Sequence, residues 1–408
     1  MSEAIAGRIS ELAAEIGLTA AGIASELVAL SHAIHAHPEL RFEEHQAAAA
    51  LETFLSAEGF SVVSGVAGMD TAFLATREFG AGGPTVGVFC EYDALPGIGH
   101  GCGHNVIAAA GAGAAVSAAR LLESRGLTAG RIVVIGSPGE EGGGGKARLI
   151  SAGALAGIDA AVMVHPAGFD IVERPLLGRV SLEVTFTGRA AHASGAPYEG
   201  LNALDAATLM LVSIGLLRQQ LRPEARVHAI MAEGGEAVNV IPERSRLKVF
   251  VRSGDPGYLR ARLQAAVENC ARGAALATGT TVEIAEVAPA YQPLKSNAPL
   301  AELTRQAFVA AGRDPATTPV PGGSSDLGNV SQVLPAIHPY ICIRPGLSMH
   351  TRDFEAAAVS PEADQAVVDG AAILGTVLAA LLSRPGLVEE ARRAFGGASA
   401  APAAGGVA

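Results

Sequence analysis

The sequence predicts an α/β protein with a parallel or mixed sheet, interrupted by an inserted α+β domain. Short apolar runs that alternate with helical stretches predict the sheet. Near Gly178 the pattern changes to strict alternation of apolar and polar residues, which is typical of a sheet with one wet face. A chain of 408 residues fits two or three domains, and 49% hydrophobic against 17% charged residues suits a large core.

A helix and three buried strands are predicted in the first part of the chain. The helix carries its apolar stripe at Ile23, Leu27, Leu30 and Ile34. Pro38 ends this helix. The strands are predicted at Thr85–Glu91, Arg131–Ser137 and Asp159–His165. Each is a short apolar run bounded by Gly or Pro, as expected for a strand covered on both faces.

The inserted domain has the element order β-α-β-β-α-β, which is the ferredoxin-like pattern. Its elements are predicted at 180–187, 203–221, 226–231, 245–252, 258–277 and 281–287. We therefore assign 179–288 to the insertion, and 1–178 with 289–394 to a discontinuous first domain. A strand near 336–343 and a helix around 362–382 resume the α/β pattern there. The Ala-rich segment 395–408 is predicted to be a disordered tail.

Composition excludes several classes of function. The net charge is −11 without a basic block, aromatic residues make up 4% and Trp is absent, so no nucleic-acid partner is expected. The four widely spaced cysteines do not suggest a disulfide framework and favour a reducing, cytoplasmic compartment. The N-terminus has no apolar signal-peptide core and no run of 18 apolar residues occurs, so no membrane association is expected.

Candidate functional side chains follow the predicted strands, where sites form in open α/β sheets. They are Asp93, Cys102, His104, Glu140, Glu141, His165 and, near the end of the chain, His350. Thiolate, imidazole and carboxylate groups are ligands for zinc and similar divalent ions. Of the adjacent pair Glu140-Glu141, one carboxylate can hold metal while the other serves as a general base.

Plainer interpretations of the same residues remain open at this point. Cys102 alone could be a buried thiol, and His165 or His350 alone could be a structural histidine. A Glu-Glu pair is usually a surface loop, but this pair follows a buried strand and precedes four glycines. Phosphate-loop, dinucleotide-binding and nucleophile-elbow patterns are missing, which excludes kinase, dehydrogenase and serine-hydrolase chemistry.

The chain resembles the aminoacylase/carboxypeptidase G family of dinuclear metallopeptidases over roughly residues 25–385. The branch it is most similar to includes p-aminobenzoyl-glutamate hydrolase, auxin-conjugate hydrolases and β-alanyl-lysine dipeptidases. The motifs that carry the resemblance are His37-Pro38-Glu39-Leu40, the segment Asp93–His104, Gly139–Gly142, Val164-His165-Pro166, Gly188–His192, Val238–Pro242, Ser324-Ser325-Asp326 and Met349-His350-Thr351. The uninterrupted run Glu91–His100 looks most like the β-alanyl-lysine dipeptidases.

The resemblance implies a zinc-peptidase-like catalytic domain and an inserted lid that also forms the homodimer. It implies two divalent ions per subunit (zinc, manganese, nickel or cobalt). The implied ligands are Cys102, His104, Glu141, His165 and His350. Asp93 would support the site, and Glu140 would be the general base toward a water that the metals bridge. The lid residue His192 would polarise the substrate carbonyl from the partner subunit, and Asn239 and Arg252 would hold the substrate's carboxylate.

Three functions from different classes remain. The first is hydrolysis of an amide bond in a β-alanyl-lysine-type dipeptide or a p-aminobenzoyl-glutamate-like N-acyl amino acid. The second is an inactive relative that binds a small acyl-amino acid. The presence of every implied ligand and of the base counts against it. The third is a scaffold that uses the dimer surface. Metal content separates the first two, and an activity assay tests the third.

Overall fold

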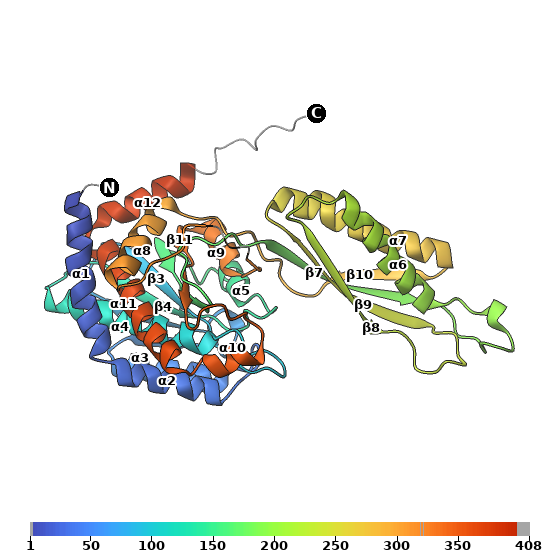
Figure 1. Ribbon diagram of the computed structural model, residues 1–408, viewed down its shortest axis with the longest axis horizontal. Helices are drawn as coiled ribbons and strands as arrows, with labels where there is room; N and C mark the ends of the chain where they lie inside the picture. The colour runs from blue at the N-terminus through green and yellow to red at the C-terminus, as the bar shows by residue number, and fades with distance from the viewer. Residues whose placement is uncertain (1–2, 319, 321, 398–408) are drawn as a thin grey trace. The chain divides into compact units, whose positions relative to one another are not determined.

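The computed structural model describes residues 3–318, 320 and 322–397. The chain divides into two compact units (Figure 1), which are described one at a time. The first unit comprises Met1–Arg174, Lys295–Pro321 and Asn329–Ala408. The second comprises Pro175–Leu294 and Gly322–Gly328. A short segment beyond residue 320 therefore joins the second unit, in addition to the continuous insertion expected from the sequence.

The first unit is built on a six-stranded sheet with the strand order β1-β2-β4-β3-β5-β11. Its strands are β1 (Ser61–Ser64), β2 (Phe73–Glu78), β3 (Thr85–Cys90), β4 (Arg131–Gly136), β5 (Ala160–Val162) and β11 (Ala336–Ile337). Strands β4, β3, β5 and β11 run parallel, whereas β1 and β2 are antiparallel additions at one edge. The predicted mixed sheet is thus confirmed.

Helices surround this sheet (Figure 1). They are α1 (Glu3–Ala21), α2 (Ala24–Ala36), α3 (His45–Ala57), α4 (His104–Ser124), α5 (Gly145–Ser151), α8 (Ala298–Ala310), α9 (Leu327–Val333), α10 (Arg352–Ala357), α11 (Pro361–Ser383) and α12 (Pro385–Gly397). Small residues let α4 pack closely on the sheet: a Cβ added at Gly111 would lie 2.8 Å from the Cys90 sulfur. Helix α12 continues to Gly397, and positions 398–408 of the predicted tail lie outside the described residues.

Among the described residues, α4 and α11 are long and apolar enough to cross a membrane, judged by length and composition alone. The bent pair Ile9–Ala21 and Ala24–Ala36 passes the same test as one broken span. In this fold, 94% of the apolar window of α4 and 83% of that of α11 are buried inside the protein. The two helices pack on each other, so their apolar surface forms the core here.

Two predicted strands are each divided in the structure. Within the predicted strand 159–165, β5 ends at Val162, and a second strand, β6 (His165–Ala167), begins at His165. The segment 336–343 likewise divides into β11 and β12 (Tyr340–Cys342). Strands β6 and β12 pair in parallel as a separate two-stranded sheet. Pro339 lies between β11 and β12 and cannot donate a ladder hydrogen bond, which favours the second interruption.

The second unit has a four-stranded antiparallel sheet with the order β10-β7-β9-β8. Its elements are β7 (Gly178–Thr187), η2 (Pro197–Glu199), α6 (Ala203–Leu217), η3 (Arg218–Gln220), β8 (Arg226–Glu233), β9 (Arg244–Ser253), η4 (Tyr258–Gln264), α7 (Ala265–Thr278) and β10 (Thr281–Glu286). Every second residue of β7 and β9 packs with α6 and α7 in one core. The opposite sheet face carries the polar residues of the alternation, as expected for one wet face.

Candidate active site

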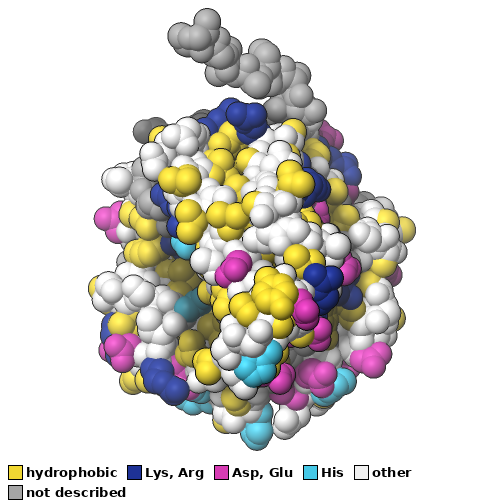
Figure 2. Space-filling view, turned by 90° about the vertical axis from the view of Figure 1, so that its right-hand side faces the viewer, with side chains coloured by type: hydrophobic (Ala, Val, Ile, Leu, Met, Phe, Trp, Pro, Cys, Tyr) yellow, Lys and Arg dark blue, Asp and Glu magenta, His cyan; other side chains and the backbone are white. Residues whose placement is uncertain are grey.

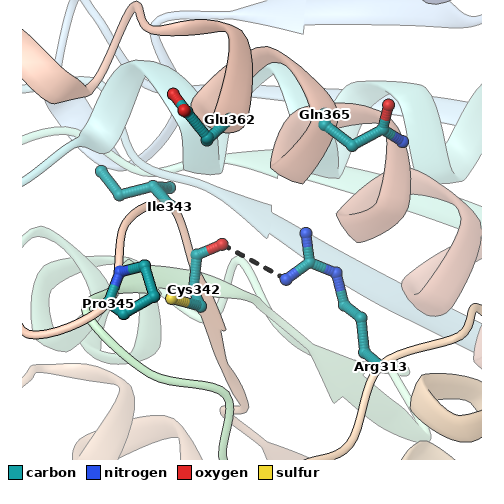
Figure 3. A pocket seen from close by; sticks show the side chains of 6 residues that line it. All are labelled: Arg313, Cys342, Ile343, Pro345, Glu362 and Gln365. Carbon is teal, nitrogen blue, oxygen red and sulfur yellow. Dashed lines mark hydrogen bonds between the residues drawn. The ribbon is translucent and has the colours of Figure 1, made fainter.

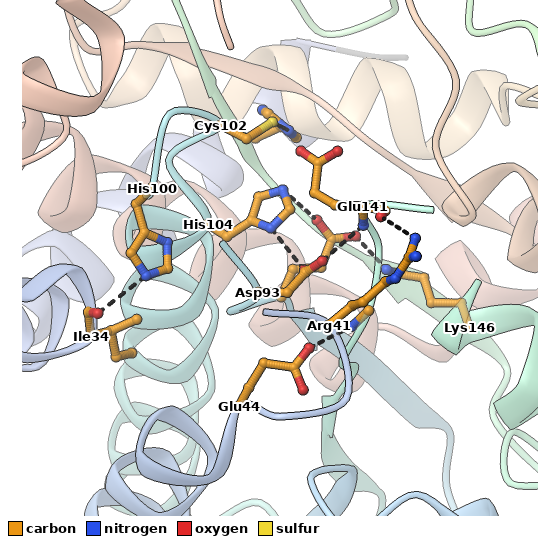
Figure 4. Close-up of polar contacts among 12 residues, drawn as sticks. Ile34, Arg41, Glu44, Asp93, His100, Cys102, His104, Glu141 and Lys146 are labelled. Atoms are coloured by element: carbon orange, nitrogen blue, oxygen red, sulfur yellow. Dashed lines mark hydrogen bonds and ion pairs between the residues drawn. The ribbon is translucent and has the colours of Figure 1, made fainter. Parts of the chain in front are cut away.

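The loops that follow the strands of the first unit bring sulfur, imidazole and carboxylate groups together (Figure 4). The Cys102 sulfur lies 3.6 Å from Nε2 of His165 and 3.3 Å from Nε2 of His350. Nε2 of His350 lies 3.3 Å from a carboxylate oxygen of Glu141. These side chains come from segments up to 248 positions apart in the sequence. The sheet therefore assembles one cluster of potential metal ligands.

The buried carboxylate of Asp93 supports two members of this cluster. One oxygen accepts a hydrogen bond from Nδ1 of His104 at 2.9 Å, and the other accepts from the backbone amide of Glu141 at 2.8 Å. Nε2 of His104 is buried and makes no hydrogen bond to any described residue. Asp93 fixes the orientation of the ring, and a carboxylate oxygen of Glu91 lies 3.7 Å from Nε2, so this nitrogen is placed as a potential metal ligand.

Both members of the Glu-Glu pair lie beside His104. Ligand atoms of His104, Glu140 and Glu141 are all within 4.8 Å of one another, as are those of Cys102, His104 and His165. Glu140 is 8% exposed, so the pair does not form an ordinary surface loop. The structure thus brings together all seven candidate residues that the sequence placed after the strands.

Unusual backbone conformations hold the cluster in place. Gly103, which precedes α4, has a φ of 75°, and a Cβ added there would lie 2.6 Å from Pro166. His350 has a φ of 64°, a region that residues with a side chain rarely occupy. Its backbone amide donates to the carbonyl of Gly101 at 2.8 Å. A strained residue of this kind persists where surrounding contacts fix it, and such residues gather at functional sites.

Burial and neighbouring charges together shift the pKa values of these groups. Burial, followed by the neighbouring His338, lowers the pKa of His165 well below its ordinary value, so the ring is neutral and its nitrogen can bind metal. Burial, and then the carboxylate of Glu141, raises the pKa of Cys102 far above its ordinary value. Burial alone would lower the pKa of His104, but Cys102 and Asp93 raise it well above its ordinary value. A bound cation would favour the thiolate instead.

The sequence signature of peptidase family M20/M25/M40 matches residues 87–380. The chain is also 38% identical to the Xaa-Arg dipeptidase of Mus musculus over 385 residues, covering 91% of this chain and 89% of that protein. This chain belongs to the M20 peptidase family. It is therefore a hydrolase that acts on C–N amide bonds, as the resemblance of its motifs implied.

Other relatives agree with the assignment to the M20 family. A p-aminobenzoyl-glutamate hydrolase chain of Escherichia coli K12 is 36% identical over 266 residues, which covers 60% of this chain and 54% of that protein. The fold is shared with an aminohydrolase from methicillin-resistant Staphylococcus aureus (TM-score 0.73, 20% identity, 90% of this chain and 99% of that one). It is also shared with a dinuclear metal-binding M20 peptidase from Bacillus subtilis (TM-score 0.64, 21% identity, 88% and 98%).

The predicted lid residues lie in the second unit of this M20 peptidase. His192 is exposed, and a backbone hydrogen bond of 3.0 Å from Ala193 to the carbonyl of Asn239 brings it close to Asn239. Nδ1 of His192 accepts from the backbone amide of Gly195 at 3.1 Å. In the neutral ring the proton is then on Nε2, which becomes a donor. Arg252 lies elsewhere, on β9 opposite Arg179, and burial followed by the charge of Arg179 lowers its pKa.

Sequence reasoning missed several residues that surround the cluster. Arg41 and Glu44 both contact the loop that carries the Glu-Glu pair. The adjoining motif His37–Leu40 carries the family resemblance but implies no role for these neighbours. His338 is fully buried, and its ring centroid lies 5.6 Å from that of His165. No local pattern indicated His338, because its position depends on pairing between distant strands.

A separate open hollow lies elsewhere on the first unit (Figure 3). Its volume is about 320 Å³, and it is lined by Arg313, Cys342, Ile343, Pro345, Glu362 and Gln365. A guanidinium nitrogen of Arg313 donates to the carbonyl of Cys342 at 3.2 Å, and the same side chain pairs with Asp170 and Asp369. The hollow contains none of the predicted site residues, so we assign it no part in the reaction.

The buried carboxyl of Glu44 leads to a prediction about pH and stability. Burial, and then the charge of Asp93, raises its pKa from 4.5 to about 7. Between these values the folded protein binds a proton that the unfolded chain does not, so the free energy of unfolding falls as pH rises, by about 1.4 kcal/mol per pH unit. Glu44→Gln removes this slope. We expect it to match the wild type near pH 4.5 and to exceed its stability by about 3 kcal/mol above pH 7.

Urea unfolding of the metal-free proteins between pH 4.5 and 8 measures this difference. Glu43→Gln is the matched control, because Glu43 is exposed in the same segment and should leave the slope unchanged. Parallel pH dependences for wild type and Glu44→Gln would show that Glu44 titrates in the ordinary range.

Proposed function

We propose that this M20 peptidase hydrolyses the amide bond of a dipeptide or N-acyl amino acid, using two divalent metal ions and Glu140 as general base. The observation that carries the proposal is the donor set around His104, where thiol, imidazole and carboxylate groups surround a buried nitrogen without a hydrogen bond among the described residues. Charged or polar groups buried together in this way are stabilised when they coordinate a cation.

The residues present fit a pair of metal ions. Cys102, His104, Glu141, His165 and His350 would hold them, with zinc, manganese, nickel or cobalt suited to such mixed ligands. When bound, the ions would lower the pKa of a water molecule and polarise the substrate carbonyl. Asp93 would keep the ring of His104 and the backbone of Glu141 oriented through its two hydrogen bonds.

The remaining chemistry falls to the side chains of the chain itself. Glu140 would take a proton from the attacking water and deliver it to the leaving nitrogen. His192 would donate the hydrogen on Nε2 to the oxygen of the substrate carbonyl, because Nδ1 is already an acceptor for Gly195. Asn239 and Arg252 would bind the carboxylate end of the substrate.

We propose as substrate the two classes that the motif resemblance implied, a β-alanyl-lysine-type dipeptide or a p-aminobenzoyl-glutamate-like compound. The relatives named for hydrolysis of Xaa-Arg dipeptides and of p-aminobenzoyl-glutamate support these two classes. The test is a hydrolysis screen of metal-loaded protein against β-alanyl dipeptides with basic C-terminal residues, p-aminobenzoyl-glutamate and N-acyl amino acids. Release of free amine from either of the first two groups supports the proposal. Binding of these compounds without turnover would instead favour an inactive relative.

We further propose a homodimer formed through the second unit, as the resemblance implied. Helix α6 exposes Leu209, Val212 and Leu216 at helical spacing, with exposed fractions of 38%, 54% and 61%. Strand β8 is an edge strand that exposes Ile230 by 63%. Exposed apolar stripes and open strand edges are surfaces that a second copy can cover. Figure 2 shows hydrophobic side chains interspersed with polar ones on one face of the molecule.

Mixing of subunits tests whether His192 acts on the partner's site. Glu140→Ala and His192→Ala subunits are each expected to be nearly inactive. If His192 acts across the dimer, each mixed dimer has one site with both residues intact. Half of the dimers in an equal mixture are mixed, so activity should recover to about a quarter of the wild type. Recovery should require subunit exchange, and failure to recover in demonstrated mixed dimers would place His192 in its own subunit's site.

We propose a cytoplasmic location as well. The four cysteines Cys90, Cys102, Cys270 and Cys342 are all free thiols in the structure. Free thiols are typical of a reducing compartment.

A further inference from the structure

The segment Glu39–Glu44, between α2 and α3, touches the loop that carries Glu140 and Glu141 at three separate points. A guanidinium nitrogen of Arg41 donates to the backbone carbonyl of Glu141 at 3.2 Å. A carboxylate oxygen of Glu44 accepts from the backbone amide of Gly139 at 2.9 Å. Phe42 supplies the third contact. Figure 4 shows Arg41 and Glu44 reaching this loop from the same side.

The ring of Phe42 fills the space that two loop glycines leave open. A Cβ added at Gly139 would lie 2.8 Å from the ring, and one at Gly143 would lie 2.6 Å from it. Phe42 itself has a φ of 66°, which is unfavourable for a bulky residue. The guanidinium of Arg148 covers the ring with its carbon 4.6 Å from the centroid. A strained residue therefore lies where this segment meets the loop that carries Glu140 and Glu141, which we call the base loop.

Glu44 is fully buried, and its second carboxylate oxygen accepts from the Thr71 hydroxyl at 2.9 Å. These two hydrogen bonds replace water around a group that is costly to bury. One of the two partners is the residue immediately before Glu140. If Glu44 only filled space in the core, an apolar side chain would do so without the free-energy cost of burying a carboxyl group.

The segment is anchored at both ends, so it can hold the loop rather than follow it. The carbonyl of Glu39 accepts from the amide of Ala94 at 2.8 Å, next to Asp93. The carboxylate of Glu39 accepts from the amides of Gln46 and Ala47 at the start of α3, at 2.9 and 3.1 Å. Since Asp93 also binds the amide of Glu141, one continuous network fixes the base loop from two sides.

We propose that Glu39–Glu44 is a clamp on the Glu140–Glu141 loop, with Glu44 as a positioning residue that sets the place of the general base through the amide of Gly139. The inference rests on the role proposed for Glu140. It assigns a purpose to the His37–Leu40 motif, which leads into the clamp and which the reaction itself does not use.

The test compares Glu44→Ala, Glu44→Gln and Glu43→Ala. Glu44→Ala removes the acceptor for Gly139, so we expect kcat to fall about tenfold or more with KM changed less than about twofold, because a small displacement of a catalytic group affects mainly the transition state. Glu44→Gln keeps an acceptor oxygen and should retain most of the wild-type kcat. Glu43→Ala alters an exposed carboxylate of the same segment and should behave as wild type.

Hydrogen–deuterium exchange of the metal-free proteins tests the clamp without relying on turnover. Glu44→Ala should raise exchange in peptides covering 138–144 and leave peptides from β3 unchanged. If that variant does not fold, Arg41→Ala tests the clamp instead. Arg41 is exposed, and removing its hydrogen bond to the carbonyl of Glu141 should raise exchange in the same peptides. Wild-type loop exchange together with wild-type kcat in Glu44→Ala would overturn the clamp, as would equal loss of kcat in Glu44→Gln and Glu44→Ala. Raised exchange with unchanged kcat would overturn Glu44 as a positioning residue, because the contact would then hold the loop without affecting the reaction.

Discussion

Glu140→Ala is expected to lower kcat by about a hundredfold or more, because general-base catalysis contributes roughly 10²–10⁴-fold. KM should change far less, since proton transfer matters mainly in the transition state. Metal content should stay close to that of the wild type, because Glu140 is assigned no metal. Steady-state kinetics with elemental analysis of the purified variant measures all three quantities. Glu140→Gln keeps the volume of this buried side chain and controls for packing.

Glu141→Ala is the informative comparison, since the two glutamates are adjacent and chemically identical. Removing Glu141 takes away a proposed ligand, which lies 3.3 Å from Nε2 of His350, and should reduce metal content. Loss of metal in Glu140→Ala with retention in Glu141→Ala would exchange the two roles. Full turnover and full metal content in both variants would place the active site elsewhere.

Removal of the metals is expected to abolish activity. Without cations the cluster leaves Nε2 of His104 with no hydrogen-bond partner among the described residues, and burial favours the neutral thiol of Cys102. Dialysis against a chelator should bring kcat below about 1% of the starting value, because the proposed nucleophile is a metal-activated water. Zinc, manganese, cobalt or nickel should restore activity and raise the thermal midpoint, since ligands that bind the folded state stabilise it.

Cobalt gives this experiment a second readout. A cobalt-loaded sample should show a thiolate charge-transfer absorption that is lost in Cys102→Ser, because the thiolate is the form that binds metal. Full activity of protein shown by elemental analysis to be metal-free would refute the metal-dependent mechanism.

Local sequence patterns were enough to predict the mixed sheet of the first unit and several individual strands. The period of two in 180–187 corresponds to β7, whose alternate residues Val180, Leu182, Val184 and Phe186 are buried. The apolar runs at 85–91 and 131–137 became β3 and β4 almost residue for residue. Helices such as α1, α3 and α8 were not assigned individually, because their modest apolar stripes become distinct only through packing on neighbouring elements.

Local patterns were also insufficient to place the end of the strand predicted at 159–165. Its apolar run continues through 159–165, but the structure ends β5 at Val162 and starts β6 at His165, paired with Tyr340. A run of apolar residues specifies burial and not the partner strand. The choice of partner depends on positions near 340, which no local window includes.

By itself, the sequence determined which chemical groups are available and that they follow buried strands: the thiol of Cys102, the ring of His104 and the Glu140-Glu141 pair. Only the tertiary structure decided how they are oriented. It directs Nδ1 of His104 to Asp93, leaves Nε2 without a hydrogen bond among the described residues, and sets Glu44 against Gly139 across 95 positions of sequence. The physical reason is that residue type and spacing encode local conformation and burial, whereas hydrogen bonds between distant segments exist only once the sheet has brought those segments together.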